Sequence, residues 1–109
     1  MSFASRLAHL ATERPLAPAV SLMHAEGGDQ LNFVELHRWS NAVAELLGAR
    51  NVGPTSTVVI GLGNSLEHVA ATWAAWKLGA MVLPLNPRSP APERAAMLAV
   101  AEPTVVIPA

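Results

Sequence analysis

Arg88 offers the clearest chemistry in this chain, because it follows the stiff pair Asn86-Pro87 directly after an apolar run at residues 81–85. A short apolar run of this kind predicts a buried strand, and ligands of open α/β sheets bind just beyond the carboxyl ends of such strands. A guanidinium in that place can bind an anion. An exposed arginine beside a loop is also often only solvated, so the residues alone leave both interpretations open.

A second candidate is Gly61-x-Gly63, which follows a β-branched run and precedes a helical segment. Glycines in this position bind a pyrophosphate in dinucleotide-binding folds. However, the third glycine position is Leu66, and no acidic residue follows the next apolar run to hold a ribose. A tight strand-to-helix turn capped by Asn64 is therefore the better prediction.

The other reactive side chains show no catalytic arrangement. Glu67 beside His68 could be an acid/base pair, but a carboxylate in a first helical turn also stabilises the helix dipole without catalysis. Trp73 and Trp76 could line a pocket, although aromatic residues at helical spacing usually belong to a core. No serine lies in a Gly-x-Ser-x-Gly elbow. No two histidines have the i, i+4 spacing of a helical metal site, so no metal ligands are predicted among the four, which are His9, His24, His37 and His68.

These candidates are positioned by a strand, helix, strand unit. The apolar runs at 58–60 and 81–85 are joined by a helical segment over about residues 65–78, which is long enough for the crossover that parallel strands need. We expect this helix to be buried on most sides. Its broad apolar face comprises Leu66, Val69, Ala70, Trp73 and Trp76.

The segments before this unit predict a helix, a β-hairpin and a second helix. The first helix covers about residues 3–12, capped by Ser2, and strands at 19–23 and 30–32 flank a glycine turn at 26–29. Asn32 and Glu35 have the spacing of a capping box for a helix reaching about residue 49, which ends with Gly53 as the left-handed stop. Its predicted inner face is Leu36, Trp39, Val43, Leu46 and Leu47.

After the unit, Ser89 and Pro90 predict the cap and first residue of another helix, whose inward residues are Met97, Val100 and Ala101. A last strand follows at residues 104–107. The fold class is therefore α/β, with a βαβαβ parallel sheet preceded by helix, β-hairpin and helix. We expect residues 1–109 to be a single, truncated piece of a larger domain, because the sequence offers no segment after the last strand to cover its faces.

Composition excludes several classes of protein. The chain has 109 residues, of which 51% are hydrophobic and 14% charged, with a net charge of -1 and no cysteine. These values favour one packed domain without a disulfide framework, and they offer no basic surplus for nucleic acid. No apolar run is long enough for a membrane span or a secretory signal, so we expect a cytoplasmic protein.

Five stretches, taken in order, resemble the N-terminal region of the AMP-forming acyl-CoA synthetases, members of the adenylate-forming superfamily. No single stretch is specific, but the ordered set covers nearly the whole chain. The chain departs from the pattern at residues 61–63, where relatives commonly have a proline before the asparagine. The stretches are Leu31-Asn32-Phe33-Val34-Glu35-Leu36, Asn51-Val52-Gly53-Pro54, Asn64-Ser65-x-Glu67, Lys77-x-Gly79-Ala80 and Pro84-Leu85-Asn86-Pro87-Arg88.

The resemblance implies an enzyme that activates a carboxylic acid with ATP and Mg²⁺ to an acyl-adenylate and then transfers the acyl group to CoA. It also implies that Arg88 contacts the nucleotide phosphate of CoA, as the matching arginine does in some relatives. Glu67-His68 and Trp76-Lys77 look most like the branch that acts on bulky acids such as bile or sterol side-chain acids. The resemblance therefore points to the bile-acid or fatty-acid CoA ligases. The phosphate loop, Thr-Glu motif, hinge aspartate and lid lysine of the superfamily do not occur in this sequence. We therefore expect the chain alone to be inactive and to bind no cofactor without its C-terminal remainder.

Two alternatives stay open. The first is an adenylation domain that loads a carrier protein in place of CoA. The second is a small stand-alone α/β domain that binds a partner through the exposed edge near Thr104.

Overall fold

The computed structural model describes residues 3–24, 27–63 and 65–108, which form two small sheets and the helices around them. The predicted α/β order is confirmed, and none of the described helices has both the length and the apolar character needed to cross a bilayer. The elements are α1 (Phe3–Glu13), β1 (Pro18–His24), β2 (Gly27–Asn32), α2 (Phe33–Gly48), β3 (Thr57–Ile60), α3 (Leu66–Lys77), β4 (Met81–Pro84), α4 (Ala91–Ala101) and β5 (Val105–Ile107).

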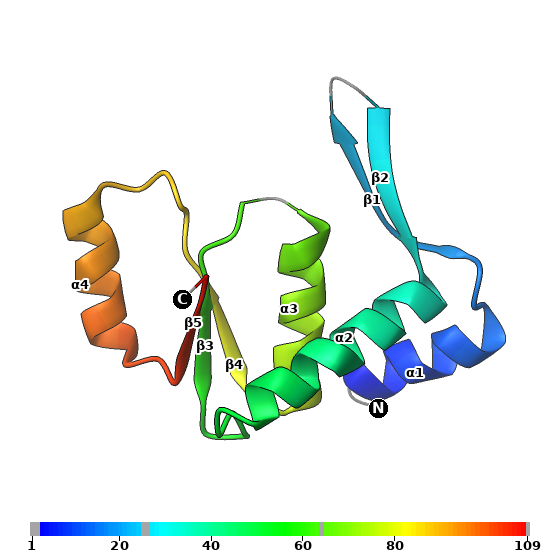
Figure 1. Cartoon of the computed structure of the whole chain (residues 1–109), viewed down its shortest axis with the longest axis horizontal. Coiled ribbons are helices and arrows are strands. Elements are labelled where there is room, and N and C mark those ends of the chain that lie inside the picture. The colour runs from blue at the N-terminus through cyan, green and yellow to red at the C-terminus, as the bar shows by residue number, and fades with distance from the viewer. Residues whose placement is uncertain (1–2, 25–26, 64, 109) are drawn as a thin grey trace.

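The second sheet is parallel and three-stranded, as predicted, and its strand order is β4-β3-β5. Val58 of β3 lies opposite Val82 of β4 and Val105 of β5, which fixes the register. Val58, Val59 and Ile60 are all fully buried, because α3 covers one face of the sheet and α4 lies on the other (Figure 1). A central strand buried on both faces explains its continuous β-branched sequence.

Helix α3 lies between two hydrophobic clusters, so the prediction that it is buried on most sides is confirmed. Its alanine side packs against the sheet and the end of α2. Its other side packs against α1, α2 and the hairpin through larger residues. The alanines in the first cluster are Ala71, Ala74 and Ala75, and the larger residues in the second are Leu66, Val69 and Trp73.

The N-cap of α3 is Ser65, whose hydroxyl oxygen accepts a hydrogen bond of 3.1 Å from the backbone N–H of His68. The sequence predicts this cap at Asn64, which lies outside the described residues. A serine with extended backbone (φ -159°) serves the same purpose, because its side chain reaches the N–H group three residues on.

The predicted hairpin is confirmed, but its turn is not where the glycines indicate. Strand β2 begins at Gly27, and Gly27 and Gly28 pair with His24 and Met23 of β1. The prediction of a turn at 26–29 is therefore wrong, because these glycines extend the ladder; residues 25–26 lie outside the described chain. Gly27 has φ +131°, which side-chain-bearing residues rarely adopt.

The capping box of α2 is confirmed in both directions. The side-chain oxygen of Asn32 accepts from the backbone N–H of Glu35 at 2.8 Å, and the Asn32 N–H donates to the Glu35 carboxylate at 3.0 Å. The helix ends through Asn51, which has φ +67°, and not through Gly53 as predicted. Asparagine tolerates the left-handed region because its short polar side chain bonds locally.

The inner face of α2 is centred differently from the prediction, since Leu46 is 69% exposed. The buried residues are Leu36, Ser40 and Leu47, which lie along one line of the helix. Hydrophobicity alone does not identify this buried line, because Ser40 lies at its centre and the exposed Leu46 lies beside it.

Helix α4 shows the largest difference from the sequence-based prediction. Its N-cap is Pro90 and not Ser89, and no side chain caps it. Met97 is 40% exposed and Val100 is 87% exposed, so the prediction that they face inward is wrong. This helix is alanine-rich and apolar on more than one side, and the partly buried residues are Arg94, Leu98 and Ala101 at helical spacing.

Candidate functional site

A cleft of about 850 Å³ lies beyond the carboxyl ends of β3 and β4, where both strands pass into loops. One wall comes from the β3–α3 loop and the first turn of α3, and the other from the end of β4 and the loop after it. Parallel strands bring these loops to the same edge of the sheet, which is where ligands of open α/β sheets bind. The lining residues are Leu62, Gly63, His68, Pro84, Leu85, Asn86, Pro87 and Arg88.

Arg88 has a fixed backbone and a free side chain in this cleft. The side-chain oxygen of Asn86 accepts from the backbone N–H of Arg88 at 2.9 Å, and the N–H of Ser89 donates to the Asn86 carbonyl at 3.1 Å. Pro87 between them restricts the loop further. The exposed guanidinium has no hydrogen bond or ion pair with the residues that the structure describes. It can therefore accept an anion without losing an existing contact.

His68 faces the same cleft from α3 with its ring held in place. Its Nδ1 lies 3.0 Å from the Leu62 carbonyl oxygen, which can only accept, so Nδ1 carries the proton in this contact. Nε2 is then the free nitrogen of the neutral ring. The partner of His68 is a backbone carbonyl and not Glu67, which lies exposed in the first turn of α3. This geometry favours the dipole-stabilising interpretation of Glu67 over the acid/base pair.

The glycine motif has a structural explanation at its first position. The backbone N–H of Gly61 donates to the carbonyl of Ile107, and a Cβ at Gly61 would lie 3.4 Å from that oxygen. A side chain there would lie directly against the end of β5. A Cβ at Gly63 would meet no atom within 4 Å. The first glycine therefore lies in close contact with the neighbouring strand of the sheet.

The two tryptophans do not line the cleft. Trp73 packs in the cluster beneath the hairpin, and its ring meets Trp76 edge to face with centroids 5.3 Å apart. Trp76 is 38% exposed. Their helical spacing therefore reflects packing, which is the usual reason for such a pair.

The histidines stay apart, and no group of three or more metal-binding side chains occurs within the described ranges. His9 pairs with Glu13 at 3.5 Å on α1, and the His24 side chain lies outside the description. His37 of α2 instead contacts Lys77 of α3, with 3.0 Å between Lys77 Nζ and His37 Nδ1. Burial, and secondarily the charge of Lys77, lower the pKa of His37.

Two arrangements have no clear signal in the sequence. His37 and Lys77 are 40 residues apart, and only the packing of α2 on α3 brings them together. Arg94 lies on the sheet-facing side of α4, where the sequence predicts apolar residues. The sequence signals its special position in one way: Arg94 is a cation in the first turns of a helix, where the helix dipole disfavours positive charge.

Residues 7–109 match the protein family described as AMP-binding enzyme. The chain belongs to this family. The resemblance identified from the five sequence stretches is confirmed.

Relatives of two kinds occur within the AMP-binding enzymes. A dimodular nonribosomal peptide synthase of Bacillus subtilis (strain 168) is 37% identical over 78 residues, which are 72% of this chain and 3% of that protein. The 4-chlorobenzoate–CoA ligase of an Arthrobacter species is 35% identical over 75 residues, which are 69% of this chain and 14% of the ligase. The chain thus spans only a small part of either relative.

The structural comparison agrees with the family. A fatty acyl CoA synthetase of Mycobacterium tuberculosis superposes with a TM-score of 0.84 at 26% identity, over 96% of this chain and 20% of that structure. The chain has the fold of part of the N-terminal subdomain of the acyl-CoA synthetases.

Proposed function

We propose that this chain is the N-terminal part of the large N-terminal domain of an acid–CoA ligase. The enzyme activates a carboxylic acid with ATP to an acyl-adenylate and pyrophosphate, and the CoA thiol then displaces AMP. The relationship to 4-chlorobenzoate–CoA ligase and to the fatty acyl CoA synthetase supports this reaction. The observation that carries it is the free guanidinium of Arg88 at the edge of the cleft.

In this proposal Arg88 binds the nucleotide phosphate of CoA. A guanidinium bonds phosphate oxygens through two parallel N–H groups, and this one is exposed on a loop that Asn86 and Pro87 hold in place. The loop therefore presents a positioned cation, and the phosphate fits the residues present. Arg88 would position CoA and take no part in bond making.

The contacts to ATP and Mg²⁺ are expected from segments beyond this chain. Transfer of an adenylyl group needs several donors or a metal around the leaving pyrophosphate. The sequence contains no Ser/Thr/Gly-rich loop ending in lysine that could supply them. We therefore expect these 109 residues alone to catalyse no acid-dependent exchange of pyrophosphate into ATP.

The test is the Arg88→Ala substitution in the whole gene product that contains this segment. We expect KM for CoA to rise about tenfold or more, because a charge-assisted hydrogen bond to phosphate is lost. Acid-dependent ATP–pyrophosphate exchange should not change, because that step precedes CoA binding. Dephospho-CoA lacks the 3′-phosphate of the CoA nucleotide, which is the phosphate assigned to Arg88. With dephospho-CoA as the substrate, the wild type and the variant should therefore have the same KM.

Arg50→Ala serves as the matched control, since Arg50 is an exposed arginine just after α2. It should leave both reactions unchanged. An unaltered KM for CoA in Arg88→Ala would refute the proposed role. A parallel loss of exchange activity would instead assign Arg88 to the adenylation step or to stability.

A carrier protein is the second candidate for the acceptor, because the nonribosomal peptide synthase relative is as similar as the ligase. An assay that offers the acyl-adenylate both free CoA and a phosphopantetheinyl carrier protein separates the two. Thioester on CoA alone supports the ligase, and thioester on the carrier alone supports the adenylation domain.

A further inference from the structure

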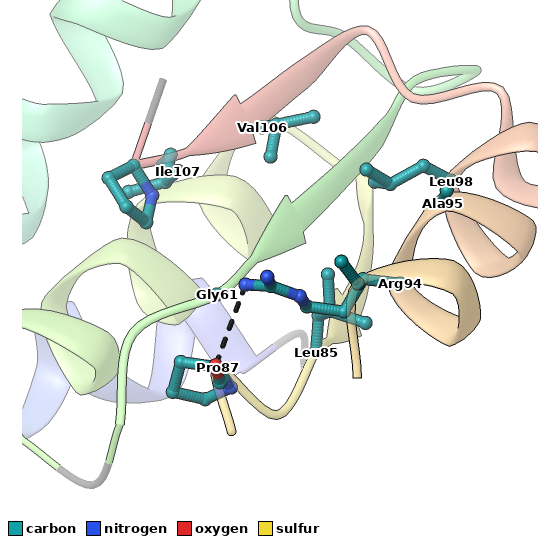
Figure 2. A pocket seen from close by; sticks show the side chains of 10 residues that line it. Gly61, Leu85, Pro87, Arg94, Ala95, Leu98, Val106 and Ile107 are labelled. Carbon is teal, nitrogen blue, oxygen red and sulfur yellow. Dashed lines mark hydrogen bonds between the residues drawn. The ribbon is translucent and has the colours of Figure 1, made fainter. Parts of the chain in front are cut away.

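A second cavity, of about 410 Å³, lies between α4 and the carboxyl ends of β3 and β5 (Figure 2). Its walls are almost entirely apolar, and the guanidinium of Arg94 reaches across it from α4 toward Gly61 and Pro87. Pro87 also lines the cleft that contains Arg88, so the two spaces are neighbours on either side of one loop. The apolar walls include Leu85, Leu98, Val106 and Ile107.

The hydrogen-bond donors of the Arg94 guanidinium have few partners in this position. One terminal nitrogen, Nη1, donates to the Pro87 carbonyl over 3.5 Å, which is a weak contact. Its Nε is buried and has no hydrogen-bond partner. No carboxylate pairs with it in the described part of the chain, and the helix dipole at the start of α4 disfavours a cation there. Partly buried arginines ordinarily have an anionic partner.

We propose that this cavity binds the carboxylate of a small apolar acid, with Arg94 as its partner. One guanidinium matches one carboxylate through two parallel N–H···O bonds, and the apolar walls match a hydrocarbon body. The chain covers Nε, so the carboxylate is bound by the terminal nitrogens Nη1 and Nη2. Nη1 gives up only its weak bond to the Pro87 carbonyl.

Charge favours a carboxylate over a phosphate at this site. A phosphate monoester carries nearly two charges and needs several donors, whereas the walls around Arg94 are apolar and supply few. The neighbouring cleft around Arg88 is the more polar of the two. The carboxylate site goes beyond the ligase proposal, because that proposal gives Arg94 no role and assigns the CoA contact to Arg88 in the neighbouring cleft.

Octanoate titrated into the ¹⁵N-labelled chain tests the proposal. We expect saturable shifts at the backbone amides of Gly61, Ala95, Leu98 and Ile107, with a Kd on the order of 1 mM, as befits a ligand of this size. Arg94→Gln should weaken binding about tenfold or more, and Arg94→Lys should weaken it less. Arg50→Gln, which alters an exposed arginine elsewhere, should not change the Kd. Octylamine, which has the same hydrocarbon body and the opposite charge, should not bind.

Several results would overturn the proposal. These are shifts remote from the cavity, equal binding of octylamine, or an Arg94→Gln variant that binds octanoate as the wild type does. Adenosine 3′,5′-bisphosphate shifting the cavity amides where octanoate does not would make this a phosphate site. If Arg94→Gln does not fold, the wild-type shifts and the octylamine control still decide the question.

Discussion

The contact between His37 and Lys77 links two helices through one ammonium group. Lys77 Nζ lies 3.0 Å from His37 Nδ1, and it donates to the His37 carbonyl at 3.1 Å and to the Asn41 side-chain oxygen at 2.6 Å. These acceptors use all three ammonium hydrogens when the imidazole is neutral. Protonation of His37 would remove one acceptor and place two cations side by side.

Stability should therefore depend on pH through His37. Burial, followed by the charge of Lys77, lowers the pKa of His37 below its usual 6.5. The unfolded chain then binds a proton at a pH where the folded chain does not, so stability is full above about pH 6.5 and falls as the pH drops below it. We expect a lower Tm at pH 5.5 than at pH 7.5 by circular dichroism.

The His37→Gln substitution isolates this effect, because glutamine offers an acceptor that does not titrate. The variant should lose much of the difference in Tm between the two pH values. His9→Gln, on the exposed face of α1, should retain it. An unchanged pH dependence in His37→Gln would show that another group is responsible.

At the scale of elements, the capping box of α2 gives a prediction with a matched control. Asn32→Ala removes the side-chain acceptor for the Glu35 N–H and should lower the free energy of unfolding by about 1 kcal/mol. Asn32→Asp keeps an acceptor in place and should lower the free energy of unfolding by less than Asn32→Ala does. Urea denaturation measures both, and equal losses in the two variants would contradict a capping role.

The same scale shows what the sequence could predict. Elements with local signals were predicted correctly: the capping box specifies the start of α2, and the apolar runs around α3 specify the parallel unit. The prediction of which residues face inward was wrong where the local signals were ambiguous. Helix α4 is apolar on several sides, so only the contact with the sheet selects Arg94 over Met97 as the inward residue.

In the candidate site, too, some features could be predicted from the sequence and others could not. The place of Arg88 could be predicted, because the carboxyl ends of parallel strands lie at one edge whatever their loops contain. The ring orientation of His68 could not, since it depends on a carbonyl six residues earlier in the loop. The cavity around Arg94 could not either, because β3, β5 and α4 come together there only in the folded chain.

At the scale of the whole molecule, part of the exposed apolar surface lies on the edge strand β4 and on α4. Met81 of β4 is 68% exposed, and an apolar hollow of about 400 Å³ lies between Leu83 and the exposed side of α4. Both β4 and β5 are edge strands of the parallel sheet. Exposed apolar surface beside an open edge favours association with further protein, which the ligase proposal attributes to the rest of the same polypeptide.

The size of the natural gene product tests that attribution directly. The proposal needs a phosphate loop and a lid from other segments, so an antibody against residues 1–109 should detect a protein of several hundred residues in the cells that make it. Immunoprecipitated protein of that size should form acyl-CoA from ATP, CoA and a carboxylic acid. A species of only 11.4 kDa would refute the ligase proposal for this protein and favour a binding domain, because the donors that adenylation requires would then be missing from the chain.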